Sequence, residues 1–455
     1  MSLGRQKDRQ SDLLLSWDEL PRSAGHPFYD QLQEVLQTAD FDRFVEDLCK
    51  PCYSSSARGR SSLPPGRYFR MLLVGYFEGL NSERGIEWRC ADSLSLREFL
   101  LLSSRENVPD HSWMSKTRSR LPLEVHEAIF AWVLKQLAEH GLVKGDRIGV
   151  DASTMEANAA LRAIVRRDSG EGYREMLQRL AKESGIETPT ADDLVRLDRQ
   201  RPGKKLSNED WESKSDHDAR IAKMKDGRTR LAYKPEHAVD LDTGAIIAAP
   251  IHSADQGDTK TLPDTLKAAG ASLEVIGKTP SQDDPAELVA DKGYHSRDGL
   301  KDLEDSAWKS RISEPKPNGI LRWKGDDDAK RAYYNNRARL LSGVARQAFK
   351  LRAELVERSF ALVLDRGGMR RAWLRGRDNV QKRYLIHISG YNLGLIMRLL
   401  TGFGTPRSLA DAKIGVIWMR YPIDSHDVVA ICYLVVIHGP SQVAVIEIQA
   451  VLLAY

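Results

Sequence analysis

The chain has 455 residues, enough for two or three domains with a sizeable buried core. Its formal charge at pH 7 is only +4, from 68 basic and 64 acidic residues, so any nucleic-acid surface must be local. Four cysteines exclude a disulfide-rich secreted scaffold, and the pair Cys49 and Cys52 has no second pair at zinc spacing. Since the N-terminus shows no apolar signal segment, we expect a cytoplasmic protein.

Helical periodicity runs through the first third of the chain. Residues 1–24 are polar, and we expect them to be flexible. From 25 to 145 apolar residues recur at helical spacing, and no strand pattern interrupts them. The segment after Asp110 is rich in Ser, Thr, Lys and Arg, which favours a DNA-binding domain of helix-turn-helix type. An ordinary helical cap on the next domain explains the periodicity nearly as well.

Two short apolar strands each end in an aspartate. The first is 147–150, followed by Asp151, and the second is 287–290, followed by Asp291 with a glycine two residues later. A third acid, Glu357, stands in a helical pattern over 353–361. Three carboxylates of this kind are hard oxygen ligands suited to divalent cations, and paired cations suit phosphoryl transfer. A plain strand followed by an Asp-initiated turn remains the alternative for each aspartate.

Between the two strands the pattern is mixed. Residues 155–225 read as a polar insert, followed by strands over 229–241, a tight turn at 242–244, a strand over 245–251 and a helix over 259–269. A helix near 296–305 and a strand over 309–313 follow the second aspartate. The order predicts an α/β fold, a mixed sheet with flanking helices. Mixed polar residues near the turn, among them His237, His252, Asp255 and Asp258, are more typical of turn chemistry than of a separate metal site.

Four strings resemble the DDE transposases of bacterial insertion sequences, in particular the insertion-sequence-five and insertion-sequence-four superfamily. They are Val150-Asp-Ala-Ser-Thr154, Ala290-Asp-Lys-Gly-Tyr-His-Ser296, Leu355-Val-Glu-Arg-Ser-Phe360 and Gly367-Gly-Met-Arg-Arg371. The resemblance covers roughly 25–410, because the strings Asp110-His-Ser112 and Arg118-Ser-Arg-Leu-Pro122 are also similar to the helical N-terminal domain of that group.

The resemblance implies a ribonuclease-H-like catalytic domain over 146–410, preceded by an all-helical DNA-binding domain over 25–145. It implies two Mg²⁺ ions, replaceable by Mn²⁺, held by the catalytic residues Asp151, Asp291 and Glu357. It also implies cutting and joining of double-stranded DNA at element ends and in the target, and we expect a dimer on that DNA. The resemblance also implies a nucleoid-associated protein, and no membrane association is expected.

One part of the family pattern is missing. Related enzymes often place Tyr seven and Arg four residues before the catalytic Glu, and Lys seven after it, where this chain has Lys350, Ala353 and Leu364. Glu354 is therefore an alternative third acid. Residues 346–383 contain eleven basic and four acidic residues. This excess of positive charge predicts a DNA contact, with a solvated surface as the alternative. The predicted DNA-binding residues are Lys292, His295, Arg370, Arg371, Trp373, Arg375 and Arg377.

The last residues, 411–455, lie beyond the resemblance. The apolar run 428–437 is too short to span a bilayer, which needs about 20 residues. It reads either as a strand paired with 443–448 or as a tail without a role. Three functions remain open: an active transposase, a degenerate copy that only binds DNA, and, more remotely, a nuclease of host DNA.

Overall fold

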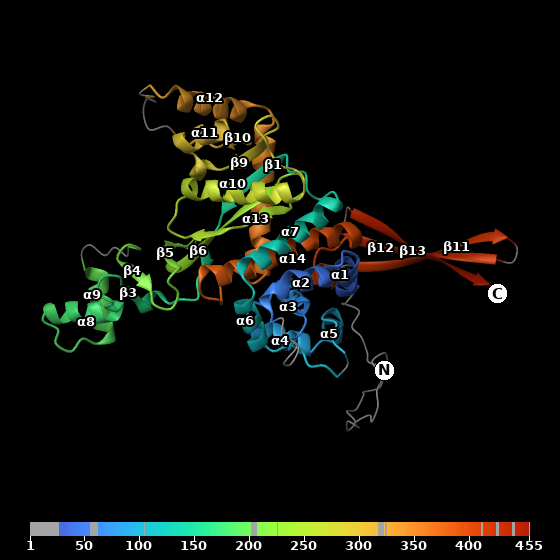
Figure 1. The fold of residues 1–455 in the computed structure, drawn as a ribbon, viewed down its shortest axis with the longest axis horizontal. Coiled ribbons are helices and arrows are strands. Elements are labelled where there is room, and N and C mark those ends of the chain that lie inside the picture. Colours follow the sequence, from blue (N-terminus) through green and yellow to red (C-terminus); the bar gives the residue numbers. More distant parts are fainter. Residues whose placement is uncertain are drawn as a thin grey trace.

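The computed structural model describes residues 27–54, 62–103, 105–201, 207–224, 226–316, 323 and 325–410, together with the backbone of three strands between 413 and 454. Expectations for residues 1–24 lie outside the described residues. Figure 1 shows a helical region in blue and teal, a sheet in green and yellow above it, and a small helical insert that projects from one end of the sheet.

The described residues of the N-terminal region form seven α-helices, which confirms the helical periodicity. The central helix is α3, almost every residue of which is buried, and its Arg70 is held by Asp42 of α2 at 2.6 Å. Ser82, Ser93 and Asp110 begin three of the helices because each side chain accepts a hydrogen bond from a free backbone N–H in the first turn. The helices are α1 (Pro27–Thr38), α2 (Phe41–Cys49), α3 (Pro65–Phe77), α4 (Glu83–Ala91), α5 (Leu94–Phe99), α6 (His111–Arg120) and α7 (Leu123–Glu139), with the short 3-10 helix η2 (Lys50–Cys52) after α2.

The central sheet is mixed, as the sequence predicts. Its path is β10-β9-β1-β6-β2, in which β10, β9 and β1 are parallel and β6 is antiparallel to β1. The two strands expected over 229–241 are one continuous strand, β6, and β5, β7 and β8 pair along its length. The strands are β1 (Arg147–Ala152), β2 (Met155–Glu156), β5 (Arg220–Lys223), β6 (Thr229–Asp240), β7 (Ile246–Ala248), β8 (Ile251–Ser253), β9 (Ala286–Ala290) and β10 (Trp308–Ile312).

The insert is the part of the chain that lies between β2 and β5. Both of these strands belong to the main sheet, so the insert proper lies inside the range 155–225 expected for it. It contains the 3-10 helix η3 (Leu161–Ala163), a two-stranded ribbon of β3 (Ile164–Arg166) and β4 (Trp211–Ser213), and helices α8 (Tyr173–Glu183) and α9 (Ala191–Gln200). Tyr173 packs edge-on against buried Trp211, which gives the insert its own small core.

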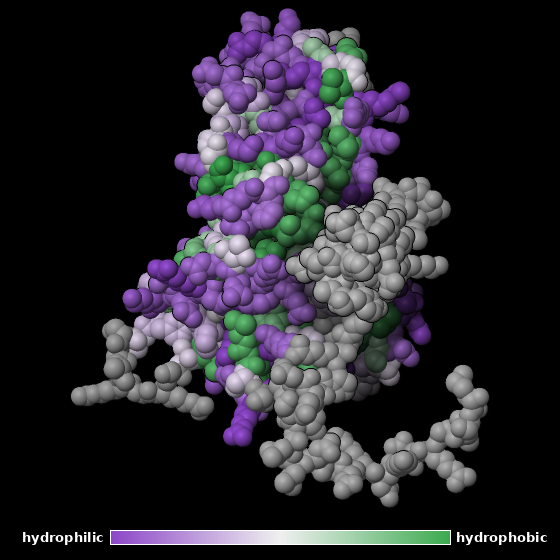
Figure 2. Space-filling model, turned by 90° about the vertical axis from the view of Figure 1, so that its right-hand side faces the viewer, coloured by the Kyte–Doolittle hydropathy of each residue, from purple (hydrophilic) through white to green (hydrophobic). Residues whose placement is uncertain are grey.

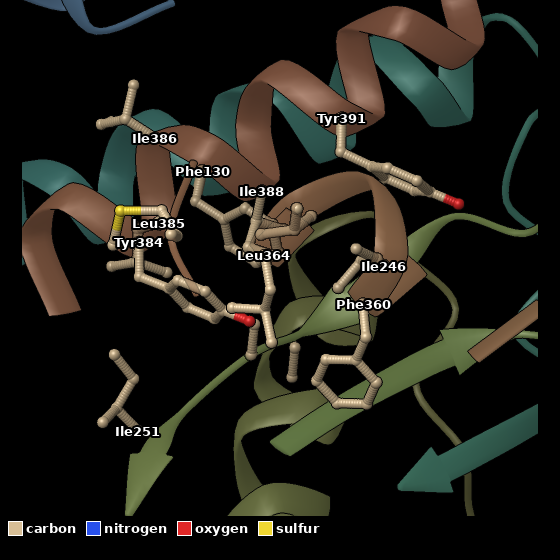
Figure 3. Close-up of a cluster of buried hydrophobic side chains, with 14 of the residues drawn as sticks. Phe130, Ile246, Ile251, Phe360, Leu364, Tyr384, Leu385, Ile386, Ile388 and Tyr391 are labelled. Atoms are coloured by element: carbon tan, nitrogen blue, oxygen red, sulfur yellow. The ribbon is translucent and has the colours of Figure 1, made fainter. Parts of the chain in front are cut away.

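Helices from the second half of the chain cover the sheet and join it to the N-terminal region. The helix α14 packs against α7 and α3 on one side and β7 on the other, and Figure 3 shows its Tyr384, Ile388 and Tyr391 among apolar side chains from both regions. A continuous apolar core therefore links the sheet to the helical region. The covering helices are α10 (Asp258–Val275), η4 (Lys292–Tyr294, 3-10), α11 (Arg297–Glu304), α12 (Asp327–Leu341), α13 (Ala345–Phe360), η5 (Ala361–Arg366, a π-helix) and α14 (Arg377–Thr401).

After the short helix α15 (Pro406–Ala410), the chain ends in a separate antiparallel sheet of β11 (Lys413–Asp424), β12 (Asp427–His438) and β13 (Gln442–Ala454). Ile437 pairs with Val443, so the expected pairing of the apolar run with the following strand is confirmed at the backbone level. In the part of the chain that is described, no helix is both long and apolar enough to cross a membrane. Figure 2 shows apolar side chains of one face in several separate groups among hydrophilic ones.

Candidate active site

Two aspartates meet at one edge of the sheet. The parallel strands β1 and β9 pair Ile148 with Leu288 and Gly149 with Val289. Continuing that register by two residues brings Asp151 level with Asp291, each at the carboxyl end of its strand. The backbone N–H of Gly293 donates to Oδ1 of Asp291 at 2.9 Å, which starts the 3-10 turn η4. The sheet topology thus places two carboxylates next to each other where a parallel sheet commonly holds its ligands.

A buried carboxylate supports the turn after Asp291. Glu236 is fully buried on β6, opposite Ala152, and its Oε1 accepts hydrogen bonds from the hydroxyl of Tyr294 at 2.7 Å and from Oγ1 of Thr261 at 3.0 Å. Burial raises the pKa of Glu236, while these hydroxyl donors oppose the shift. Tyr294 is the last residue of η4, so its bond to Glu236 fixes the turn that follows Asp291.

A further carboxylate lies beside this turn. A Cβ atom on Gly293 would come 2.5 Å from Oδ2 of Asp258 and 3.1 Å from Oδ1 of Asp291, so only glycine leaves room between the two side chains. Asp258 is in turn paired with Nζ of the buried Lys234 at 2.7 Å. This arrangement explains the glycine two residues after the second aspartate, and it adds Asp258 and Lys234 to the surroundings of the site.

The helix α13 crosses the sheet next to the two aspartates. Nη2 of Arg352 lies 3.0 Å from Oδ2 of Asp151, and Nε of Arg352 donates to the carbonyl oxygen of Val150 at 3.2 Å. A Cβ atom on Gly149 would come 2.6 Å from Leu241 and 3.2 Å from Cγ of Arg352. Gly149 therefore allows α13 to approach β1 closely, and the residue of α13 that reaches Asp151 is an arginine.

A buried histidine fastens the other end of α13 to the sheet. His237 pairs with Asp151 across β1 and β6, and its ring stacks on Phe360 at 4.0 Å. Oγ of Ser359 already donates to a backbone carbonyl, so it accepts from Nδ1–H of His237 at 2.7 Å, while the hydroxyl of Tyr384 donates to Nε2 at 2.7 Å. Burial lowers the pKa of His237 to about 3. The neutral ring is a structural clamp between β6, α13 and α14.

The two candidate third acids differ in their surroundings. Glu354 and Glu357 are both exposed on α13, and Glu354 is paired with Arg358 one turn later. Among the described residues, the carboxylate of Glu357 has neither an ion pair nor a hydrogen bond. The same described residues contain no group of three His, Cys, Asp or Glu side chains arranged to hold a metal ion. The site is therefore not assembled as a closed cage around Asp151.

Of the residues expected to bind DNA, Arg370 is held by internal contacts and Arg377 lies apart from the other arginines. Nε of Arg370 lies 2.7 Å from Asp365, and its Nη1 donates to Oγ of Ser153 at 3.2 Å, which ties the segment to the end of β1. The backbone N–H of Arg377 donates to Oδ2 of Asp218 at 2.9 Å, and its side chain lines a different cleft, between α7, α10 and α14. The structure thus separates Arg377 from the other arginines.

Three of the expected residues do lie together. The guanidinium of Arg371 lies over the ring of Trp373, 5.3 Å from its centre, and Nε of Arg375 donates to the carbonyl oxygen of Asn158 at 3.4 Å. Trp373 is about half exposed. Its carbonyl oxygen accepts from the side-chain amide of Asn158 at 2.8 Å, which holds this segment against the start of the insert. These side chains form an exposed basic surface beyond the end of β2.

The residues after Asp291 have different surroundings from each other. Lys292 is exposed at the sheet edge. His295 packs edge-on against Tyr333 of α12, and its Nε2 is buried without a hydrogen-bond partner in the described part of the chain. Burial lowers the pKa of His295. Lys292 therefore remains available for contact with a phosphate, whereas His295 turns toward α12.

Polar residues of the site that the sequence patterns missed share one property. Each is largely removed from water, whereas hydrophobic periodicity places polar residues on the surface. Only the sequence motif around Tyr294 gave a signal, because it directly follows the second aspartate. The missed residues are Lys234, Glu236, Arg352 and Ser359, together with Tyr294 and Tyr384.

A mixed sheet with two carboxylates at adjacent strand ends, crossed by a helix that carries Glu354 and Glu357, is suited to phosphoryl transfer. Comparison with protein families agrees, since residues 195–393 match the transposase DDE domain and residues 18–120 match the transposase domain (DUF772). The chain is a DDE transposase. No curated protein and no solved structure shows a significant match to it.

The family implies three coarse properties. A transposase DDE domain has a ribonuclease-H-like fold, typically uses divalent metal ions, and belongs to an enzyme that cleaves DNA. The matched segments include Asp291 and Glu357 but leave out 121–194, so Asp151 lies outside both. The position of Asp151 beside Asp291 therefore depends on the strand register, which is independent of the family match.

Proposed function

We propose that this transposase binds the ends of an insertion sequence, cleaves DNA strands there and transfers them to a target. The observation that supports the proposal is the register of β1 and β9, which brings Asp151 level with Asp291. Within the DDE family this edge of the sheet is the natural place for the reaction. We assign Asp151, Asp291 and Glu357 as the catalytic residues.

The donor chemistry of these residues fits Mg²⁺ or Mn²⁺, since all three offer carboxylate oxygens and Glu357 has no partner among the described residues. Two bound ions would activate the attacking oxygen and relieve charge on the leaving oxygen. The protein's own part is positioning. The bond between Tyr294 and Glu236 holds the turn after Asp291, and the contacts of His237 hold α13, which carries Glu357, against β6.

Arg352 has a distinct part in this proposal. It holds Asp151 through an ion pair at 3.0 Å, so a positive charge already stands at the strand edge. A guanidinium at this place neutralises the carboxylate when no cation is bound and can contact a phosphate oxygen when one is. The Tyr, Arg and Lys that the family places around the catalytic Glu are absent from this chain. In our proposal Arg352 supplies one of the basic groups that contact phosphate in their place.

DNA contact is divided among several surfaces in our proposal. The N-terminal helices 25–145 recognise the element ends, residues 146–410 form the catalytic domain, and the strands after 411 have no assigned role. Lys292, Arg371, Trp373 and Arg375 are the exposed candidates for contact near the reaction. We expect a dimer on DNA, since an element has two ends that must be joined to one target.

A second function has a specific observation in its favour. Because Arg352 occupies Asp151 and no three acids converge in the described residues, a degenerate copy that binds DNA without cutting it is the competing proposal. A cleavage assay on a duplex carrying the inverted repeat that borders the coding sequence separates the two. Strand cleavage with Mg²⁺ that EDTA abolishes supports the transposase reaction, and binding without cleavage supports the degenerate copy.

A further inference from the structure

A cleft of about 730 Å³ opens at the base of the insert, where β2 and the first residues of β6 meet the segment 371–375. Figure 1 shows the insert projecting from this end of the sheet. Five arginines and a single carboxylate, Glu156, line the cleft. The arginines are Arg162, Arg228, Arg230, Arg371 and Arg375.

The positive charge of the cleft is only partly neutralised. Glu156 is shared by Arg230, with which it forms a close ion pair, and Arg371, whose Nε lies 3.8 Å away. Arg230 also lies 3.8 Å from Asp226. Among the described residues, the exposed side chains of Arg162 and Arg228 have no carboxylate partner. An open cleft with several arginines and one carboxylate is suited to the repeated phosphates of a nucleic acid.

Backbone hydrogen bonds give the cleft a fixed wall. The N–H of Glu156 donates to the carbonyl oxygen of Arg370 at 3.0 Å, and the N–H of Ala372 donates to the carbonyl oxygen of Glu156 at 2.7 Å. The segment that carries Arg371 and Arg375 is thus attached to β2 as a short added strand. The guanidinium groups project from a fixed framework, and less side-chain and loop ordering is required when a ligand binds.

The cleft has a defined place relative to the catalytic aspartates. Asp151 pairs with His237 of β6, and Glu156 pairs with Ala232, five residues along the same strand. At about 3.3 Å per residue this separation is roughly 16 Å. A duplex that runs along β6 rises 3.4 Å per base pair, so this separation corresponds to about five base pairs.

We propose that this cleft binds the sugar–phosphate backbone of element-end DNA about five base pairs from the cleaved bond. The inference rests on the proposed function, since DNA held at Asp151 decides which phosphates reach the cleft. Arg162 and Arg228 are assigned here as phosphate-binding residues, next to Arg371 and Arg375. The contact is to the backbone, so it adds affinity and register without sequence preference.

The test compares full-length variants by their affinity for a duplex carrying the bordering inverted repeat, measured over a range of salt concentrations. R162Q/R228Q removes two phosphate contacts, so the slope of log affinity against log salt becomes shallower by about two units. R162K/R228K keeps the charge and the slope. The matched control R174Q/R199Q removes two exposed arginines on α8 and α9 that do not line the cleft, and its slope equals that of the wild type.

Phosphate ethylation locates the contact. With the wild-type protein, ethylation about five phosphates from the cut interferes with binding, and this interference disappears with R162Q/R228Q. An unchanged slope in R162Q/R228Q, or an equal loss in the control, overturns the cleft assignment while leaving the proposed function intact. Failure of the wild type to bind the repeat better than a random duplex overturns the proposed function itself. Both substituted pairs of arginines are exposed, and thermal unfolding verifies that each of the three variants folds.

Discussion

Nη2 of Arg352 and Oδ2 of Asp151 lie 3.0 Å apart, which joins α13 to the carboxyl end of β1. Both side chains are largely removed from water, with 12% of the arginine and 27% of the aspartate exposed. The guanidinium of Arg352 balances the negative charge of Asp151, which lies next to the negative charge of Asp291. The stability of the metal-free protein and its affinity for divalent cations should therefore both depend on Arg352.

Replacing Arg352 by Gln should lower the free energy of unfolding of the metal-free protein by about 2 kcal/mol, because Asp151 loses its ion-pair partner and the carbonyl oxygen of Val150 loses a charged donor. Added Ca²⁺ should then stabilise R352Q more than the wild type, since the cation neutralises the charge of Asp151 that Arg352 no longer balances. Thermal unfolding with and without Ca²⁺ measures both effects. R358Q on the exposed side of α13 is the control, and an equal loss in that variant would remove the special role of Arg352.

Asp151→Asn and Asp291→Asn should each abolish strand cleavage and leave end binding nearly unchanged. The substitutions keep the shape of the side chain and remove the charge that a divalent cation needs. Gel shift and cleavage on the same terminal duplex measure the two properties separately. Mg²⁺ or Mn²⁺ should support cleavage, and Ca²⁺ should support binding alone. An Asn variant that still cuts would contradict the assignment.

Glu357→Gln should abolish cleavage, whereas Glu354→Gln should retain most of it. Glu354 is already paired with Arg358, and Glu357 has no partner among the described residues, so only Glu357 is available without breaking an ion pair. Both side chains are exposed, and the two variants should unfold at nearly the same temperature as the wild type. The reverse pattern of activities would place the third ligand one turn earlier on α13.

Tyr294→Phe should lower the free energy of unfolding by about 1–2 kcal/mol, because the buried carboxylate of Glu236 loses a donor. The turn after Asp291 loses its anchor as well, so the affinity for Mn²⁺, measured by electron paramagnetic resonance, should fall. Tyr334→Phe changes a tyrosine that is 44% exposed on α12 and serves as the control. Unaltered Mn²⁺ affinity in Y294F would limit Tyr294 to a structural role.

The stability of the fold should fall in acid partly because of His237. Burial holds its pKa at about 3 in the folded protein, below the usual 6.5, so the neutral ring contributes stability above pH 6.5. That contribution is lost as the pH falls from 6.5 toward 3, at up to about 1.4 kcal/mol per pH unit. Urea unfolding at several pH values should show that the free energy of unfolding depends less steeply on pH in H237N than in the wild type. H217N changes a largely exposed ring and should leave the dependence unaltered.

Local sequence patterns predicted the elements that carry the site. Short apolar runs ending in Asp151 and Asp291 became β1 and β9, because such runs must be buried in a sheet whatever surrounds them. On α13, Val356 and Phe360 are buried one turn apart, which agrees with the helical pattern predicted over 353–361. The parallel pairing that makes the two aspartates neighbours was not visible, since it joins strands separated by more than 130 residues.

The polar contacts that hold the site were decided by tertiary structure alone. Arg352 and Ser359 lie on the face of α13 that meets the sheet, and Glu236 and His237 are buried in β6, although their polarity predicts exposure. Burial of a polar side chain is stable only where a partner satisfies it, and these partners come from distant parts of the chain. The sequence therefore determined which strands and helices form, and the three-dimensional packing decided which polar groups could be buried together.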